Sequence, residues 1–135
     1  MGTPTMTLKG ALDLMRTERA GYLVIADEHS KLQGMFTERE VLMKVLGKKV
    51  PLSEPVSKYM RTDLHTLTKN DTIERALYLM SEFNIRHIPL LDEFGQVCGV
   101  LSVRTIVRFL SELFPEEVFN LPPKADQHHE TAEGG

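Results

Sequence analysis

Apolar residues in the second half of the chain are spaced first as in a helix and then as in a strand. A helix is predicted where apolar side chains recur every three or four residues, at Ile73, Ala76, Leu77 and Met80. We expect Asn70 or Asp71 to cap its first turn, because short polar side chains accept hydrogen bonds from free helix amides. This segment therefore opens the second half with a helix.

The next apolar runs are short and predict a β-hairpin followed by a helix. His87–Leu91 is a nearly continuous apolar strand, and 92–95 is a turn in which the glycine suits a positive φ angle. Val97–Leu101 forms the return strand. A helix is then predicted over 102–114, where Pro115 ends it.

The first half repeats this pattern at a fixed offset of 65 residues. From Thr7 and Thr72 to Val45 and Leu110 the two halves align without a gap, with nine identities in 39 pairs. Such self-similarity predicts two copies of one structural unit. The first copy should then contain a helix over 7–18, strands over 22–26 and 32–36, a turn over 27–31 and a second helix over 37–46.

The repeat also predicts how the chain is divided. We expect a first motif over 1–47, a linker over 48–60, a second motif over 61–115 and an acidic, disordered tail over 116–135. The linker contains two prolines, Val56–Met60 can form one helical turn, and His65–Leu67 suggests a short strand. The counterpart of that strand in the first copy would lie at or before Met1, so the first motif is expected to start late.

Composition places the chain among ordinary globular proteins. It has 135 residues, of which 41% are hydrophobic and 26% are charged. A single cysteine, Cys98, excludes an internal disulfide, so a cytoplasmic location is expected, and on its apolar strand Cys98 should be a small buried hydrophobe. No apolar run is long enough for a membrane span, so the membrane is not an expected partner.

Charge and motifs argue against two further classes of function. The net charge is −3, no basic stripe is present, and nucleic acid is therefore not an expected partner. The chain contains no Gly-rich phosphate loop, zinc-protease motif or nucleophile elbow. His128 and His129 are adjacent in the tail and are best interpreted as solvent-exposed. We therefore expect no catalytic residues, no metal site and no enzyme activity.

Two equivalent strand-to-helix corners are the best candidates for a binding site. Each follows a glycine-marked strand and places a hydroxyl residue, Thr37 or Ser102, at a helix start. Free amides and the helix dipole there suit a phosphate, and Glu40, three residues after Thr37, could accept hydrogen bonds from ribose hydroxyls. The alternative is structural, because Thr37 and Glu40 also have the spacing of a capping box.

These motifs resemble a tandem pair of CBS domains, the cystathionine-β-synthase motif, over about residues 5–115. The resemblance rests on the doubled ALxLM sequence, on the strand phrase 84–92 (NIRHIPLLD) and on the corner sequences GMFTERE and GVLSVRT. It implies an α/β (α+β) fold of two pseudo-symmetric repeats, each a small sheet packed against two helices. In this family the repeats form a Bateman module whose two clefts often bind adenosine-containing ligands.

The resemblance also implies roles for individual residues. In the first cleft, Thr37 and Arg39 would contact the phosphate, Glu40 the ribose and Tyr22 the adenine. In the second cleft, Ser102 and Arg104 keep the phosphate contacts, but Thr105 replaces the acidic residue that the family usually has. Glu40 itself stands where Asp is usual. The Glu40 cleft is therefore expected to be the better nucleoside site.

Residues outside the corners complete the expected second cleft. Arg86 and His87 would add positive charge at the strand start, although either could instead bond the sheet edge. His65 and Thr66 would contact the base or the sugar. Arg104 and Arg108, one helical turn apart, could also be an ordinary solvated face.

The function expected from the resemblance is that of a stand-alone regulatory module. It would bind AMP, ADP or ATP, with NAD and S-adenosylmethionine as alternatives, would require no cofactor, and would signal to an unknown effector protein. A homodimer is expected through the apolar excess of the terminal helices, which includes Val41, Leu42, Phe109, Leu110 and Leu113. The competing interpretation is a structural dimerisation or docking module whose clefts stay empty.

Overall fold

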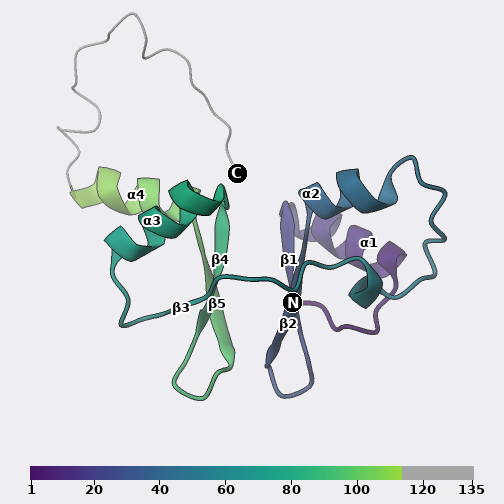
Figure 1. Ribbon diagram of the computed structural model, residues 1–135, viewed down its shortest axis with the longest axis horizontal. Coiled ribbons are helices and arrows are strands. Elements are labelled where there is room, and N and C mark those ends of the chain that lie inside the picture. The colour runs from purple at the N-terminus through teal and green to yellow at the C-terminus, as the bar shows by residue number, and fades with distance from the viewer. Residues whose placement is uncertain (114–135) are drawn as a thin grey trace, which may run out of the picture.

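The computed structural model describes residues 1–113, and the predictions for Phe114, Pro115 and the tail lie outside them. Two units of similar architecture lie side by side, each with a β-hairpin flanked by helices (Figure 1). None of the helices within the described residues has the length and apolar character that crossing a membrane requires.

The first unit follows the predicted order of elements. Helix α1 (Leu8–Glu18) is capped by Thr7, whose side chain accepts a hydrogen bond from the Gly10 amide. Strands β1 (Tyr22–Ala26) and β2 (Leu32–Thr37) then pair in antiparallel register. After β2 come α2 (Glu38–Glu40) and η1 (Val41–Val45).

The second unit repeats these elements and adds one strand. A 3₁₀ turn, η2 (Val56–Lys58), lies in the linker, and β3 (Leu67–Thr68) pairs in parallel with β4 (His87–Leu91). Helix α3 (Ile73–Phe83) lies between these two strands in the sequence. Strand β5 (Val97–Ser102) pairs with β4, giving the order β3-β4-β5, and α4 (Val103–Leu113) follows.

The backbone obeys the offset of 65 residues in detail. Gly2 bridges Ile25 in parallel, as Leu67 pairs with Leu90 in the second unit. The helix ends agree as well, because Arg19 and Asn84 both have a φ angle of 53°. Gly95, the predicted positive-φ position, has a φ angle of 77°. The fold class is therefore confirmed: two pseudo-symmetric α/β repeats.

Each unit has its own apolar core. In the first, Leu8, Ile25 and Phe36 are fully buried between α1 and the hairpin. In the second, Ala76 and Ile88 are fully buried, and Ile106 from α4 packs with them. Two separate cores explain why each repeat forms a unit, since each buries its apolar faces within itself.

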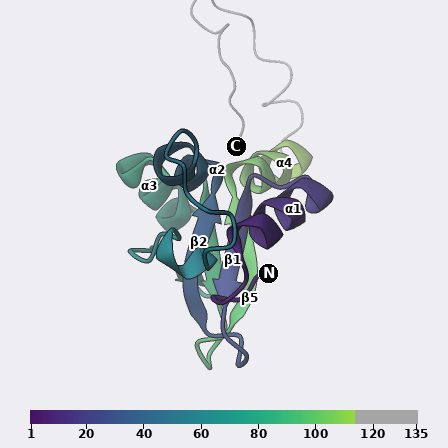
Figure 2. The same ribbon diagram turned by 90° about the vertical axis from the view of Figure 1, so that its right-hand side faces the viewer.

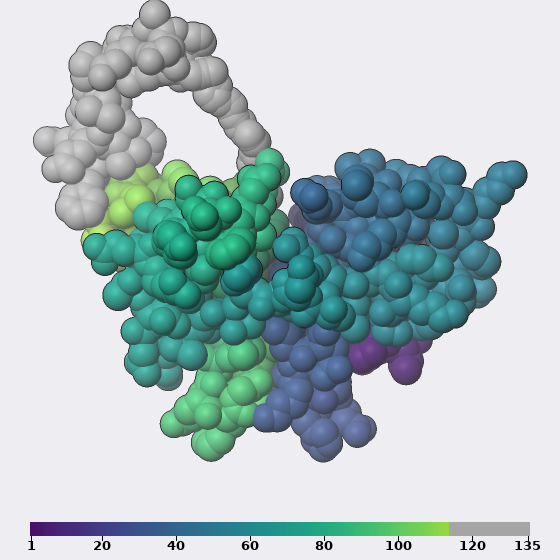
Figure 3. Space-filling view, viewed as in Figure 1, coloured from purple at the N-terminus to yellow at the C-terminus, as the bar shows by residue number. Residues whose placement is uncertain are grey.

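The two units meet through equivalent residues. The rings of Tyr22 and His87, which are 65 positions apart, have centroids 4.3 Å apart. Lys31 and Gln96, another equivalent pair, form an antiparallel bridge near the hairpin tips. Figure 2 shows α2 and α3 on one side of the sheets and α1 and α4 on the other, as a pseudo-two-fold axis requires. In Figure 3 the units meet along one seam of the surface.

Three local predictions were wrong. Helix α3 is capped by Thr72, whose hydroxyl accepts from the Arg75 amide, because Asp71 instead bonds the Thr68 amide. The segment after Glu40 is wider than an α-helix: Val41–Val45 is a π-helical turn closed by Leu46 N–H donating to the Val41 carbonyl.

Cys98 is the third. It is exposed, whereas Leu101, which points the opposite way along β5, packs on the second core. The two positions differ by three, an odd number, so when Leu101 faces the core Cys98 points to the opposite face of the strand.

Candidate functional site

The corner after β2 is held by hydrogen bonds between Thr37 and Glu40. The Thr37 amide donates to Glu40 Oε1 at 3.0 Å, and the Thr37 hydroxyl donates to the same oxygen. Glu40 is only 4% exposed. The capping-box interpretation of this pair is therefore confirmed, and the proposed ribose contact would have to be made by an already engaged carboxylate.

The corner amides are less free than the sequence suggested. Glu38 N–H donates to the Gly21 carbonyl at 3.0 Å, and Arg39 N–H donates to the Thr37 hydroxyl at 3.2 Å. The second corner is the same, since Val103 N–H donates to the Arg86 carbonyl. The expectation of free amides for a phosphate is thus wrong for Glu38 and Arg39, because strand pairing and the cap occupy their N–H groups.

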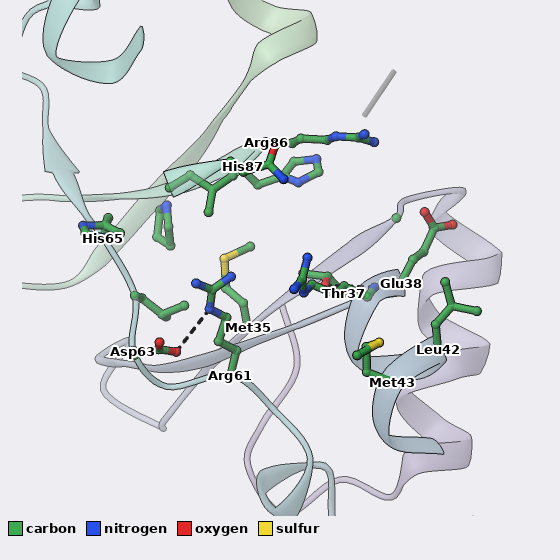
Figure 4. A pocket seen from close by; sticks show the side chains of 16 residues that line it. Met35, Thr37, Glu38, Leu42, Met43, Arg61, Asp63, His65, Arg86 and His87 are labelled. Carbon is green, nitrogen blue, oxygen red and sulfur yellow. Dashed lines mark hydrogen bonds and ion pairs between the residues drawn. The ribbon is translucent and has the colours of Figure 1, made fainter. Parts of the chain in front are cut away.

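A cleft of about 500 Å³ opens between the two units beside this corner. Side chains of both units face it, with Arg86 and His87 on one side and Met35, Thr37 and Arg61 on the other (Figure 4). The cleft, named here the main cleft, is lined by Gly21, Met35, Thr37, Glu38, Arg39, Leu42, Met43, Arg61, Asp63, Leu64, His65, Asn84, Ile85, Arg86, His87 and Pro89.

Arginines dominate the charge of the main cleft. Arg61 Nε lies 3.1 Å from Asp63 Oδ1, and this contact holds the pKa of Asp63 below its usual value. Neither Arg39 nor Arg86 forms an ion pair with any residue between 1 and 113. Two arginines without carboxylate partners give the cleft a site for an anion.

His87 contributes to the main cleft through the packing of its ring and not through a positive charge. Burial, helped by the nearby Arg86 charge, lowers the pKa of His87 below its usual value. The imidazole is therefore neutral at pH 7, and the positive charge expected at this strand start comes from Arg86. The ring packs against Tyr22 with an interplanar angle of 34°, so it links the cleft to the contact between the units.

A smaller hollow adjoins the main cleft, with a volume of about 330 Å³. It shares Arg39, Arg61, Asp63 and Asn84 with the main cleft. Its remaining lining residues are Glu40, Lys44 and Phe83. We name this space the side hollow. Its lining is mostly polar, whereas the main cleft is lined by both polar and apolar residues. His65 stacks on Phe83 with ring centroids 4.1 Å apart, which packs the segment before β3 against α3.

The structure brings together only part of the predicted site. Thr37 and Arg39 line the main cleft, and Glu40 lines the side hollow. The expected place of His65, Arg86 and His87 in the second cleft was wrong: all three line the main cleft, because the start of β4 faces the corner of the first unit. The other predicted residues line neither: Tyr22, Thr66, Ser102, Arg104 and Thr105. Of these, Tyr22 lies behind His87, and Ser102 and Thr105 share a hydrogen bond of 2.9 Å at the other corner.

Sequence reasoning missed the contribution of the segment that directly follows the linker. Arg61 and Asp63 have no counterpart in the first copy, so the repeat could not point to them. Their position is set by the antiparallel bridge between Met35 and Arg61, in which each amide donates to the other's carbonyl. Gly34 makes this approach possible, since a Cβ there would lie 2.7 Å from the Arg61 carbonyl oxygen.

Comparison with known proteins agrees with this architecture. The chain is 30% identical to the CBS domain-containing protein YhcV of Bacillus subtilis over 101 residues, covering 75% of this chain and 71% of YhcV. It is 28% identical to an uncharacterized 17.7 kDa protein of Acidianus ambivalens over 110 residues, covering 82% of this chain and 66% of that protein.

Solved structures give the same result. The CBS domain protein NE2398 superposes with a TM-score of 0.73 at 29% identity, covering 80% of this chain and 84% of that one. CBSX2, solved in complex with AMP, superposes with a TM-score of 0.73 at 21% identity, covering 84% and 87%. The CBS domain model matches residues 3–47 and 56–112. The chain therefore belongs to the CBS domain family, as a tandem pair of its motifs.

Proposed function

We propose that this chain is a regulatory module that binds an adenosine-containing ligand in the main cleft. The observation that carries the proposal is the cleft itself, about 500 Å³ in volume, walled by both copies and holding two arginines without ion-pair partners among residues 1–113. A tandem CBS relative of the same fold, CBSX2, has been solved with AMP. The chain is proposed to act through binding and not as an enzyme.

The lining suits a ligand with an apolar flat part and an anionic part. Met43, Leu64 and Ile85 supply accessible apolar surface of the kind that buries a purine. Arg39 and Arg86 supply guanidinium groups, which bind phosphate through paired hydrogen bonds. NAD and S-adenosylmethionine carry the same adenosine group and are alternative ligands of this site.

Binding between the copies provides the route for regulation. A ligand that contacts Arg39 in one unit and Arg86 in the other favours the packing of the units that brings both within reach. The ligand shifts the equilibrium by its difference in affinity for the two packings. A partner that recognises one packing is then controlled through the same coupling free energy.

Arg39 offers a direct test with a matched control. We expect Arg39→Gln to weaken adenine-nucleotide binding about 10–100-fold, since a hydrogen bond to a charged group contributes about 1.5–3 kcal/mol. Arg104→Gln alters the equivalent residue of the other corner, which does not line the main cleft, and should leave affinity within about twofold. Isothermal titration calorimetry with AMP, ADP and ATP measures both variants.

Two results would contradict the proposal. One is an affinity loss in Arg104→Gln that equals the loss in Arg39→Gln, which would move the site to the other corner. The other is the absence of binding by AMP, ADP, ATP, NAD and S-adenosylmethionine at millimolar concentration. The second result would favour a structural docking module, for which both corners give some support because Thr37 with Glu40 and Ser102 with Thr105 satisfy one another.

A homodimer is proposed on the exposed apolar side chains of the terminal helices. Leu42 is 64% exposed, and Leu113 and Phe109 are 54% and 44% exposed. Val41 and Leu110, which we expected at this interface, instead pack against the cores of their own copies. Leu42 also borders an apolar groove between α1 and η1, which would be covered in a dimer.

We expect Leu42→Glu to convert a dimer into a monomer, because a charge would be buried at the contact. Light scattering coupled to size exclusion at micromolar concentration measures the mass. Leu52→Glu is the control, since Leu52 is 44% exposed but lies in the linker, and it should stay dimeric. A monomeric parent protein would rule out this interface.

A further inference from the structure

We propose that the side hollow is a polyphosphate subsite, so that the chain binds nucleoside di- and triphosphates more tightly than monophosphates. The inference rests on the proposed function, because it places the adenine of the same ligand in the main cleft. It adds the class of ligand that the site would prefer, namely nucleoside di- and triphosphates. A nucleotide long enough to reach the side hollow is selected over one that fills the main cleft alone.

The two spaces are connected through shared walls. Arg39, Arg61, Asp63 and Asn84 line both, so a ligand lying against Arg39 can extend from one space into the other. The two spaces differ in the chemistry of their lining residues. The main cleft has several aliphatic side chains, whereas Phe83 is the one apolar side chain among the residues of the side hollow.

The cations of the side hollow are available to a ligand. Lys44 Nζ donates to the Tyr59 carbonyl at 3.2 Å and has no carboxylate within ion-pair distance among residues 1–113. Arg39 likewise has none. Arg61 is paired with Asp63, whose side chain is 83% exposed and is therefore free to turn toward water when phosphate oxygens approach.

The acidic groups of the side hollow are already engaged. Glu40 Oε1 accepts hydrogen bonds from both the amide and the hydroxyl of Thr37. Asp63 is neutralised by Arg61. Three cations therefore face two carboxylates, of which one is tied to the corner and the other to an arginine. This balance favours an anionic tail over a free divalent cation.

Phosphate would have to be bound by side chains, because the corner amides are already hydrogen-bonded within the protein. Glu38 N–H and Arg39 N–H are both bonded within the protein, at 3.0 and 3.2 Å. Phosphate oxygens at this corner would therefore be held by guanidinium and ammonium groups. A second or third phosphate gains a contact only if further cationic side chains lie within its reach. Lys44 and Arg61 provide such side chains in the side hollow.

Lys44→Gln tests the subsite, with adenosine, AMP, ADP and ATP titrated by calorimetry in the absence of magnesium. In the parent protein we expect ATP to bind at least about tenfold more tightly than AMP, since one charged hydrogen bond gives that factor. In Lys44→Gln the ratio should fall to about threefold or less while AMP affinity stays within about twofold. Lys48→Gln, a nearby exposed lysine outside both spaces, should keep the parent ratio.

The outcomes separate the inference from the proposed function. Equal affinities for AMP and ATP in the parent protein, or an equal loss of both in Lys44→Gln, would overturn the subsite and leave the nucleotide site intact. A parental ratio in Lys44→Gln would also overturn it. If AMP, ADP and ATP all fail to bind, the subsite is overturned, and the proposed function is overturned with it when NAD and S-adenosylmethionine also fail to bind.

Discussion

Replacing Phe36 with alanine is expected to lower the free energy of unfolding by about 3–5 kcal/mol. Phe36 is fully buried on β2, where it packs in the first core with Leu8 and Ile25. Removing the ring costs its burial and leaves a cavity that the closely packed neighbours can only partly fill. Since β2 ends at Thr37, a loosened strand would also disturb the main cleft.

Phe94→Ala is the matched control for this change. Phe94 is 68% exposed at the tip of the second hairpin, so its truncation should change stability by less than about 0.5 kcal/mol. Urea unfolding followed by circular dichroism measures both variants. A Phe36→Ala protein as stable as Phe94→Ala would show that the first core does not hold the unit together as described.

Glu40→Ala is expected to reduce both stability and nucleotide affinity, and Thr105→Ala to reduce neither appreciably. Loss of the Glu40 carboxylate leaves the partly buried Thr37 amide without its acceptor, at a cost of about 1–3 kcal/mol. Thr105 is exposed, and within residues 1–113 its side chain hydrogen-bonds only the Ser102 hydroxyl, so its truncation should cost less than about 0.5 kcal/mol.

The affinity arm of this experiment tests the proposed ribose contact. Both bonds from Thr37 go to Oε1, so Oε2 can still accept from a sugar hydroxyl, and Glu40→Ala should weaken binding about tenfold. Glu40→Gln retains an acceptor oxygen and should lie between the parent and alanine variants in both measurements. If Glu40→Ala is destabilised but binds nucleotide with parental affinity, the residue is a helix cap alone.

The repeat made most of the fold predictable from the sequence. Once the offset of 65 was recognised, the strand at His87–Leu91 predicted the strand at Tyr22–Ala26, and the structure contains both. Apolar spacing identified the helices because each buries one face. It could not show that Val41–Val45 widens into a π-helical turn, since that depends on which carbonyl the Leu46 amide reaches.

The site was less predictable, because it lies between elements that are distant in sequence. The motif identified Thr37 and Arg39, but only the folded chain shows that Arg61, just after the linker, lines the main cleft with them. Local patterns also could not show which amides remained free. The acceptor of Glu38 N–H is Gly21, which lies 17 residues earlier and reaches the corner through strand pairing.

The pairing of Tyr22 with His87 and of Lys31 with Gln96 is the pattern of an isologous interface, closed within one polypeptide. Two separate half-length chains making these contacts would come apart on dilution. The covalent connection replaces bulk concentration by an effective local one, which for short flexible connections is in the millimolar range. The cleft between the halves therefore stays assembled at any concentration of the protein.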